Sequence, residues 1–202
     1  MLNHTLEDNM TELDDIFNAI KADPQNAEYT ARGVDPLYAV DPAAKIVLIG
    51  QAPGIRAEQS KMYWNDPSGD RLREWMGIDR DTFYDPKQVA IIPLDFYYPG
   101  KGKSGDLPPR KGFAEKWHPQ LLAALPNLQL TVLIGMYAQK YYLGKNRKRT
   151  LTDTVHAYQE YLPKYFPLVH PSPRNQLWMS RNPWFAEDVL PDFKQRVHTI
   201  LQ

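Results

Sequence analysis

Four short apolar runs, separated by helical patterns, limit the folds that this sequence can adopt. The runs are 45–50 (KIVLIG), 88–94 (QVAIIPL), 128–135 (LQLTVLIG) and 166–170 (FPLVH). Short apolar runs rich in β-branched residues and bounded by turn residues indicate buried strands. Helical patterns fill the intervals at 68–78, 112–125 and 136–144. This alternation predicts an α/β fold with three layers, α/β/α, around a four-stranded, mainly parallel sheet.

Both ends of the chain read as helices that flank this core. At the N-terminus, residues 5–22 carry apolar side chains at helical spacing, namely Leu6, Met10, Leu13, Ile16, Phe17 and Ile20. At the C-terminus, a closing helix is expected over 182–201, with Asn182 as N-cap, Pro183 in the first turn and a kink at Pro191. We expect a single domain spanning 1–202, in which 1–44 form the helix and a connector and 45–202 form the core.

Composition excludes several classes of site. The chain has no cysteine, so disulfides, thiolate zinc sites and cysteine-bound iron–sulfur clusters are excluded. Lys+Arg and Asp+Glu are both 24, so only local clustering can point to a charged partner. Lys101, Lys103, Arg110 and Lys111 form one basic cluster and 145–149 (KNRKR) another; either is a solvated loop or a contact for nucleic-acid phosphates. Lacking an apolar run of membrane-spanning length and a signal-peptide pattern, the protein is expected to be cytoplasmic, with no membrane partner.

Two unusual loops follow the first and last predicted strands. Residues 50–54 (GQAPG) form a tight turn whose backbone N–H groups can face a ligand, although an ordinary strand-to-helix turn has the same pattern. Residues 170–175 (HPSPRN) place His170 at the end of a strand in a stiff, proline-rich loop. Ligands of open parallel sheets bind beyond the carboxyl ends of the strands. We therefore expect the two loops to face each other, with His170 donating a hydrogen bond to a developing negative charge.

These residues resemble the uracil-DNA glycosylase superfamily. The resemblance rests on 47–54 (VLIGQAPG) and 169–175 (VHPSPRN), and it extends to 62–78 and 126–144 and, in outline, from 45 to 200. The branches that it most resembles are related to the iron–sulfur bacterial and archaeal enzymes. Such enzymes flip a damaged base out of DNA and hydrolyse the bond between the base and deoxyribose.

The resemblance implies a role for each site residue. His170 would stabilise the departing base, and the backbone of Gln51 and Ala52 would contact the base or the attacking water. Trp64 would stack on the base, and the base pocket would also involve Gly50, Pro53, Gly54 and Ser172. Arg174 and Asn175 would enter the minor groove, with Lys101 and Lys103 on DNA phosphates. No metal or other cofactor is implied, the partner is single- or double-stranded DNA, and a monomer is expected.

The sequence departs from the family pattern at three points. The first loop carries Gln51 and Ala52 where many members have a carboxylate or amide that positions water, so Asp66 or Asp95 could supply a carboxylate from another loop. The end of the second strand has no asparagine to read uracil, and Asp95 could pair with a different base edge. An ordinary helix start at Asp66 and a turn at Asp95 are the structural alternatives. Because the cysteines are missing, the loops that the cluster would hold in the iron–sulfur branch are expected to be held by packing, with Phe96, Tyr97, Tyr98 and Trp117 as the candidate aromatics.

Two other functions fit parts of the sequence. Ala52 and the missing asparagine are compatible with a glycosylase fold that binds nucleic acid or a nucleobase without cleaving it. An esterase using Ser172 and a histidine is weaker, because Ser172 lies between two prolines and no Gly-x-Ser-x-Gly turn is present. His118, which precedes Pro119, is expected near a helix start in a structural role.

Overall fold

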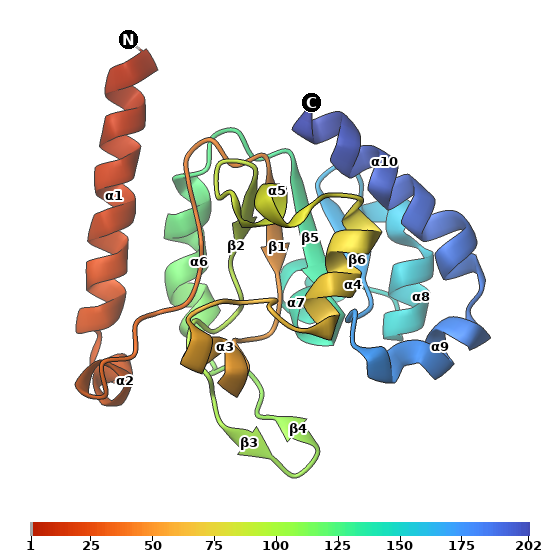
Figure 1. Ribbon diagram of the computed structural model, residues 1–202, viewed down its shortest axis with the longest axis horizontal. Coiled ribbons are helices and arrows are strands. Elements are labelled where there is room, and N and C mark those ends of the chain that lie inside the picture. Colours follow the sequence, from red (N-terminus) through yellow and green to blue (C-terminus); the bar gives the residue numbers. More distant parts are fainter. Residues whose placement is uncertain (1) are drawn as a thin grey trace.

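A four-stranded parallel sheet forms the centre of the molecule (Figure 1). The computed structural model describes the backbone of residues 2–202 and the side chains of residues 11–202. The strands are β1 (Ile46–Ile49), β2 (Val89–Ile91), β5 (Leu130–Ile134) and β6 (Tyr165–Leu168), in the order β2-β1-β5-β6. All neighbours pair in parallel, which confirms the α/β fold expected from the four apolar runs. Pro167 is tolerated in β6 because that strand lies at the edge of the sheet.

Helices connect and cover the strands. The α-helices are α1 (Leu2–Ala22), α2 (Ala27–Ala31), α3 (Ile55–Ser60), α4 (Pro67–Met76), α5 (Arg80–Tyr84), α6 (Phe113–Ala123), α7 (Gly135–Leu143), α8 (Leu151–His156), α9 (Gln176–Arg181) and α10 (Leu190–Leu201). Short 3-10 turns lie at η1 (Pro24–Asn26), η2 (Gly144–Asn146), η3 (Tyr158–Tyr161) and η4 (Pro173–Asn175), and η5 (Phe185–Val189) is a π-helical segment. Two strands outside the sheet, β3 (Lys101–Gly102) and β4 (Gly105–Asp106), pair as an antiparallel hairpin.

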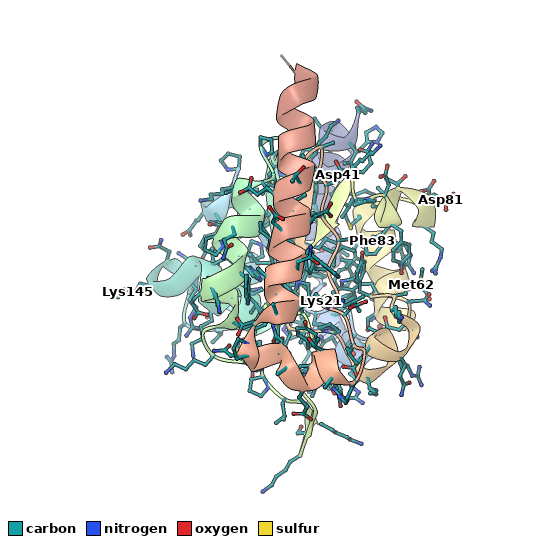
Figure 2. All side chains as sticks on the ribbon, turned by 90° about the vertical axis from the view of Figure 1, so that its left-hand side faces the viewer. Lys21, Asp41, Met62, Asp81, Phe83 and Lys145 are labelled. Atoms are coloured by element: carbon teal, nitrogen blue, oxygen red, sulfur yellow. The ribbon has the colours of Figure 1, made fainter. Side chains whose placement is uncertain are left out.

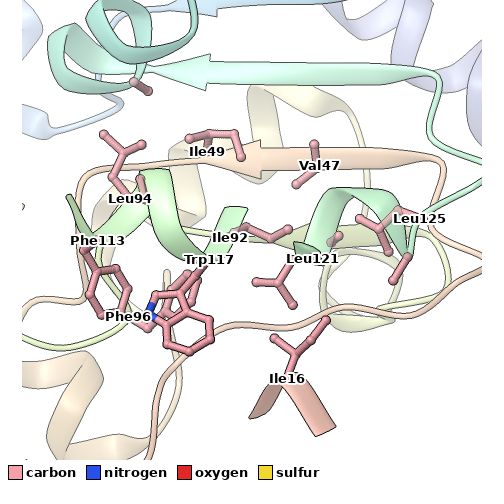
Figure 3. Close-up of a cluster of buried hydrophobic side chains, with 14 of the residues drawn as sticks. Ile16, Val47, Ile49, Ile92, Leu94, Phe96, Phe113, Trp117, Leu121 and Leu125 are labelled. Carbon is pink, nitrogen blue, oxygen red and sulfur yellow. The ribbon is translucent and has the colours of Figure 1, made fainter. Parts of the chain in front are cut away.

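Two buried clusters, one on each face of the sheet, give the expected three layers. One cluster joins α1 and α6 to alternate residues of the central strands, including Val47, Ile49 and Leu121 (Figure 3). The other joins α4 and α10 to the opposite residues of the same strands, including Ile46 and Leu48. The alternation arises because successive side chains of a strand point to opposite faces.

The N-terminal helix packs on the outer side of α6, where it crosses the face of the molecule seen in Figure 2. Leu13, Ile16 and Ile20 are buried there, as the helical spacing predicts. The side chains of Leu6 and Met10 lie outside the described residues.

An ion pair that the sequence did not reveal ties this N-terminal region to the core. Arg110 donates to both carboxylate oxygens of Asp95, at 2.7 and 2.8 Å, and also to the backbone carbonyl of Gln25 and the side chain of Asn26. Its guanidinium lies over the rings of Tyr29, Tyr97 and Phe113. Of the four aromatics expected to pack the loops, Phe96, Tyr97 and Trp117 are buried, whereas Tyr98 is only partly buried. Arg110 is therefore half-buried and engaged by Asp95 and the N-terminal region, so it does not belong to an exposed basic cluster.

The C-terminal segment differs from the expected single helix. Asn182 ends α9, and its side-chain amide donates back to the carbonyl of Trp178, so it does not cap the following helix. The π-helical segment runs directly into α10, because Val189 and Leu190 both keep right-handed helical backbone angles. Pro191, the position expected to bend, therefore lies within a continuous helix, directly after its hydrogen bonding changes from π to α; such a change and a proline are both usual causes of a bend.

Candidate active site

A cavity of about 500 Å³ opens at the carboxyl ends of the parallel strands. Both loops singled out in the sequence line it, so they do face each other. The predicted site residues that line it are Gly50, Gln51, Ala52, Pro53, Gly54, Trp64, Asp66, His170, Ser172 and Arg174.

His170 is held in one tautomer by its own loop. The backbone N–H of Ser172 donates to Nδ1 of His170 at 3.2 Å. A ring nitrogen that accepts a hydrogen bond carries no proton, so in the neutral ring the proton sits on Nε2. Burial lowers the pKa of His170 from its ordinary 6.5, while the negative charge of Asp66 opposes the shift. At neutral pH the ring is therefore an uncharged donor through Nε2.

The loop that carries His170 is fixed from two sides. Asn175 donates its side-chain amide to the carbonyl oxygen of His170 at 2.7 Å. From α4, Arg71 donates to the carbonyl oxygen of Ser172 at 3.2 Å. Asn175 does not line the cavity, and its amide is used within the protein. The hydroxyl of Ser172 accepts from the N–H of Arg174, and its contact with His170 runs through backbone N–H, which is not the geometry of an activated nucleophile.

Trp64 forms the wall beside His170 and has an unusual backbone. Its φ is +53°, in the left-handed region that bulky residues rarely adopt. Arg73 of α4, which is buried, donates to the Trp64 carbonyl oxygen at 3.1 Å. Gly69 makes room for the same oxygen, because a Cβ at position 69 would lie 1.7 Å from it. The conformation is therefore imposed by α4, and backbone strain of this kind is concentrated at functional sites.

The GQAPG turn continues the sheet and then contacts the hairpin. The carbonyl oxygens of Gly50 and Gln51 accept from the N–H groups of Leu94 and Asp95. The side-chain amide of Gln51 donates to the carbonyl oxygen of Leu107 at 2.9 Å. Gln51 thus joins the turn to the base of the β3–β4 hairpin, and Ala52, the next residue of the turn, lines the cavity.

The structure separates the two carboxylates that the sequence left as alternatives. Asp66 caps α4, since its Oδ1 accepts from the N–H of Gly69 at 2.9 Å, and it also lines the cavity. Asp95 is completely buried, does not line the cavity, and binds Arg110 and the backbone of Tyr97. Asp95 is therefore placed as a structural anion, away from the position expected of a base contact.

The residues expected on DNA are divided between the cavity and the hairpin. Arg174 is exposed and lines the cavity. Lys101 and Lys103 are exposed on the β3–β4 hairpin, outside the cavity lining. Figure 1 shows the hairpin projecting beyond the carboxyl ends of the strands, next to α3.

Other residues that line the cavity were not singled out in the sequence, among them Tyr137, Asn65 and Asp106. Tyr137 follows β5, a position that the strand-end rule indicates. Asn65 follows Trp64, and Arg80 holds its side-chain oxygen at 2.8 Å. Asp106 comes from the hairpin, whose sequence KGKSGD has no alternating apolar pattern that would have revealed it.

His118 lies inside α6, not near its start, and it is buried. Its Nε2 faces the carbonyl oxygen of Pro93 at 2.9 Å, so this nitrogen carries the proton and Nδ1 accepts from the hydroxyl of Tyr142. Burial lowers its pKa to about 4. The neutral ring supports Pro93, a cavity residue, from below.

Within residues 11–202 no cluster of three or more metal-ligating His, Asp or Glu side chains is found. The described helices also include none with the length and apolar character needed to cross a bilayer.

Comparison with protein families shows to which family the chain belongs. The family model of the uracil DNA glycosylase superfamily matches residues 37–194, which include every residue that lines the cavity. The chain belongs to this superfamily. The match begins after the N-terminal helix, so α1 lies outside the shared region. Among solved structures, the chain is similar to the solution NMR structure of a candidate uracil DNA glycosylase from Methanosarcina acetivorans, with a TM-score of 0.48 and 14% identity, over 83% of this chain and 99% of that chain.

Proposed function

We propose that this chain is a monofunctional DNA glycosylase that hydrolyses the N-glycosidic bond of uracil or another deaminated base in DNA. Membership of the superfamily supports the reaction class. The observation that carries the proposal is the tautomer of His170, whose Nδ1 is occupied by the N–H of Ser172. In the reaction, water adds to C1′ of the deoxyribose, and the bonding electrons leave with the base.

His170 acts on the departing base. As the bond breaks, negative charge accumulates on a base oxygen. The Nε2–H of His170 is a fixed donor in a partly desolvated site, where such a donor stabilises developing charge more than water does. The loop contacts from Asn175 and Arg71 keep it in place, so little reorganisation is needed during the reaction.

Trp64 and Asp66 complete the site. Stacking of a flipped base on an aromatic ring is worth roughly 1–3 kcal/mol, and Trp64 presents its ring beside His170. Asp66 can replace the water-positioning side chain that the GQAPG loop lacks. It lines the cavity, and its negative charge partly offsets the lowering of the His170 pKa by burial. We assign it to orienting water and stabilising the positive charge of the sugar.

Arg174 and the hairpin lysines would hold the phosphates. A bifunctional glycosylase cuts the strand through an amine that forms a Schiff base. Within the described residues, no lysine lines the cavity, which supports a monofunctional enzyme.

The test is an excision assay on end-labelled DNA with one uracil, in single and double strands, followed by hot alkali to cut abasic sites. The wild type should give alkali-dependent cleavage, and His170→Ala should reduce its rate by at least about 100-fold. His198→Ala, in the exposed last turns of α10, is the matched control and should behave as the wild type.

Hypoxanthine and xanthine substrates extend the assay to the other deaminated bases. Tight binding of uracil-containing DNA without an abasic product from any of these bases would replace the enzyme with a non-cleaving binder. Strand cutting without alkali would contradict the monofunctional assignment.

A further inference from the structure

Asp106 brings a carboxylate to the side of the cavity away from His170. The GQAPG turn spans the two sides. Its first glycine, Gly50, faces Trp64, since a Cβ there would lie 3.4 Å from the indole. Its last glycine, Gly54, faces Asp106, whose Oδ2 would lie 3.6 Å from a Cβ at that position. A base that stacked near Trp64 and His170 would therefore have Asp106 at the other end of the GQAPG turn.

Two hydrogen bonds hold the end of the hairpin next to Asp106. Gln51 donates to the carbonyl of Leu107, the next residue, and the N–H of Leu107 donates to the carbonyl of Gly100. Desolvation, and then the negative charge of Asp106, raise the pKa of the Tyr98 phenol, which places Tyr98 near this carboxylate. The GQAPG turn thus holds the backbone beside Asp106 at the cavity, while the Asp106 side chain is exposed.

We propose that Asp106 is a specificity-determining residue that reads the N–H edge of the flipped base and selects a 6-oxopurine of the hypoxanthine type over uracil. This inference rests on the proposed glycosylase function and deepens it. Asp106 thereby takes the base-reading role that the sequence suggested for Asp95, which is instead bound to Arg110.

The selection follows from hydrogen-bond chemistry. An ionised carboxylate only accepts hydrogen bonds. The N3–H of uracil lies between two carbonyl oxygens, which repel an approaching carboxylate on both sides. The N1–H of hypoxanthine has a carbonyl on one side and a C–H on the other, so one carboxylate oxygen can accept from it with less repulsion. Xanthine has the size of hypoxanthine but places its N1–H between two carbonyls, as uracil does.

The experiment compares kcat/KM for three duplexes that carry hypoxanthine, xanthine or uracil, using the wild type and Asp106→Asn. Asparagine offers an N–H donor as well as an acceptor, so it matches a carbonyl next to an N–H. We expect Asp106→Asn to lower the ratio of hypoxanthine to uracil excision, and of hypoxanthine to xanthine excision, by roughly tenfold, the scale of one side-chain pairing with a base. Asp81→Asn removes an exposed charge on α5 and should leave both ratios unchanged.

The outcomes separate this inference from the function on which it rests. Excision of any of these bases with ratios that Asp106→Asn does not move would overturn the inference and leave the glycosylase intact. A wild type that prefers uracil to hypoxanthine would also overturn it. If the wild type releases no base, both fail. A fall in xanthine excision equal to that of hypoxanthine would show that the residue senses purine size, against the proposal.

Discussion

The indole of Trp64 lies against the imidazole of His170, with ring centroids 5.5 Å apart and planes tilted by 35°. The two residues come from loops more than a hundred positions apart, and both loops are held by arginines of one helix. Arg73 binds the carbonyl of Trp64, and Arg71 binds the carbonyl of Ser172. Helix α4 therefore sets the relative position of the two side chains against which a base would lie.

Gly69→Ala tests this dependence. A Cβ at position 69 would overlap the Trp64 carbonyl oxygen, so the Trp64 loop must move. We expect kcat/KM to fall at least about tenfold, because the loss of base stacking is worth roughly 1–3 kcal/mol. Glu74→Ala, an exposed change in the same helix, is the control. Full activity in the Gly69 variant would show that the position of Trp64 is not critical.

The pH dependence of excision tests the charge state of His170. Its pKa is lowered, so the neutral form persists below pH 6.5. Protonation of Nδ1 would break the bond from Ser172. We expect kcat/KM to stay flat from pH 8 to about 6.5 and to fall only at lower pH. A loss of activity as the pH rises through 6.5 would instead identify the cation as the working form.

Asp66→Asn separates the charge of this residue from its capping role. Asparagine is as good an N-cap as aspartate, so stability should change little. We expect kcat to fall at least about tenfold through loss of the carboxylate, with the acid limb of the pH profile shifted down, since Asp66 favours protonated His170. Asp79→Asn is matched, because Asp79 caps α5 in the same manner. If both variants changed kcat to the same extent, the role of Asp66 would be limited to capping α4.

Arg110→Ala tests the buried ion pair. Removing this side chain leaves the fully buried Asp95 without its cation. We expect the free energy of unfolding in urea to fall by about 3–5 kcal/mol, the usual cost of breaking a buried pair. Lys111→Ala should change it by less than about 0.5 kcal/mol. If activity fell by more than the loss of folded protein explains, Asp95 would have a role in the active site as well.

Salt dependence tests the hairpin. If Lys103 contacts a phosphate, Lys103→Ala should reduce the slope of log K against log salt for DNA binding by about 1. Lys87 is exposed and precedes β2, so it lies at the amino ends of the strands, away from the cavity. Its alanine variant should keep the wild-type slope. Two identical slopes would remove the hairpin from the DNA interface.

The sheet and the facing loops could be predicted because they depend on local patterns. Apolar runs such as 130–134 specify buried strands, and the carboxyl-edge rule then places the GQAPG and HPSPRN loops together. The role of Asp95 could not be predicted from the sequence, because its burial and its bond to Arg110 bring together residues that lie 15 positions apart in the chain. The conformation of Trp64 likewise depends on Gly69 and Arg73, and nothing in the residues beside it announces a left-handed backbone.

The β3–β4 hairpin contributes no buried side chain between Lys101 and Leu107, although it supplies one side of the cavity. With the role proposed for Asp106, the choice of base would be encoded in a stretch of sequence that contributes little to the stability of the chain. Substitutions in the hairpin are expected to leave each successive variant folded, so that a new base preference can be reached one substitution at a time. For an engineer, a library restricted to residues 101–106 would explore base recognition on an otherwise constant scaffold.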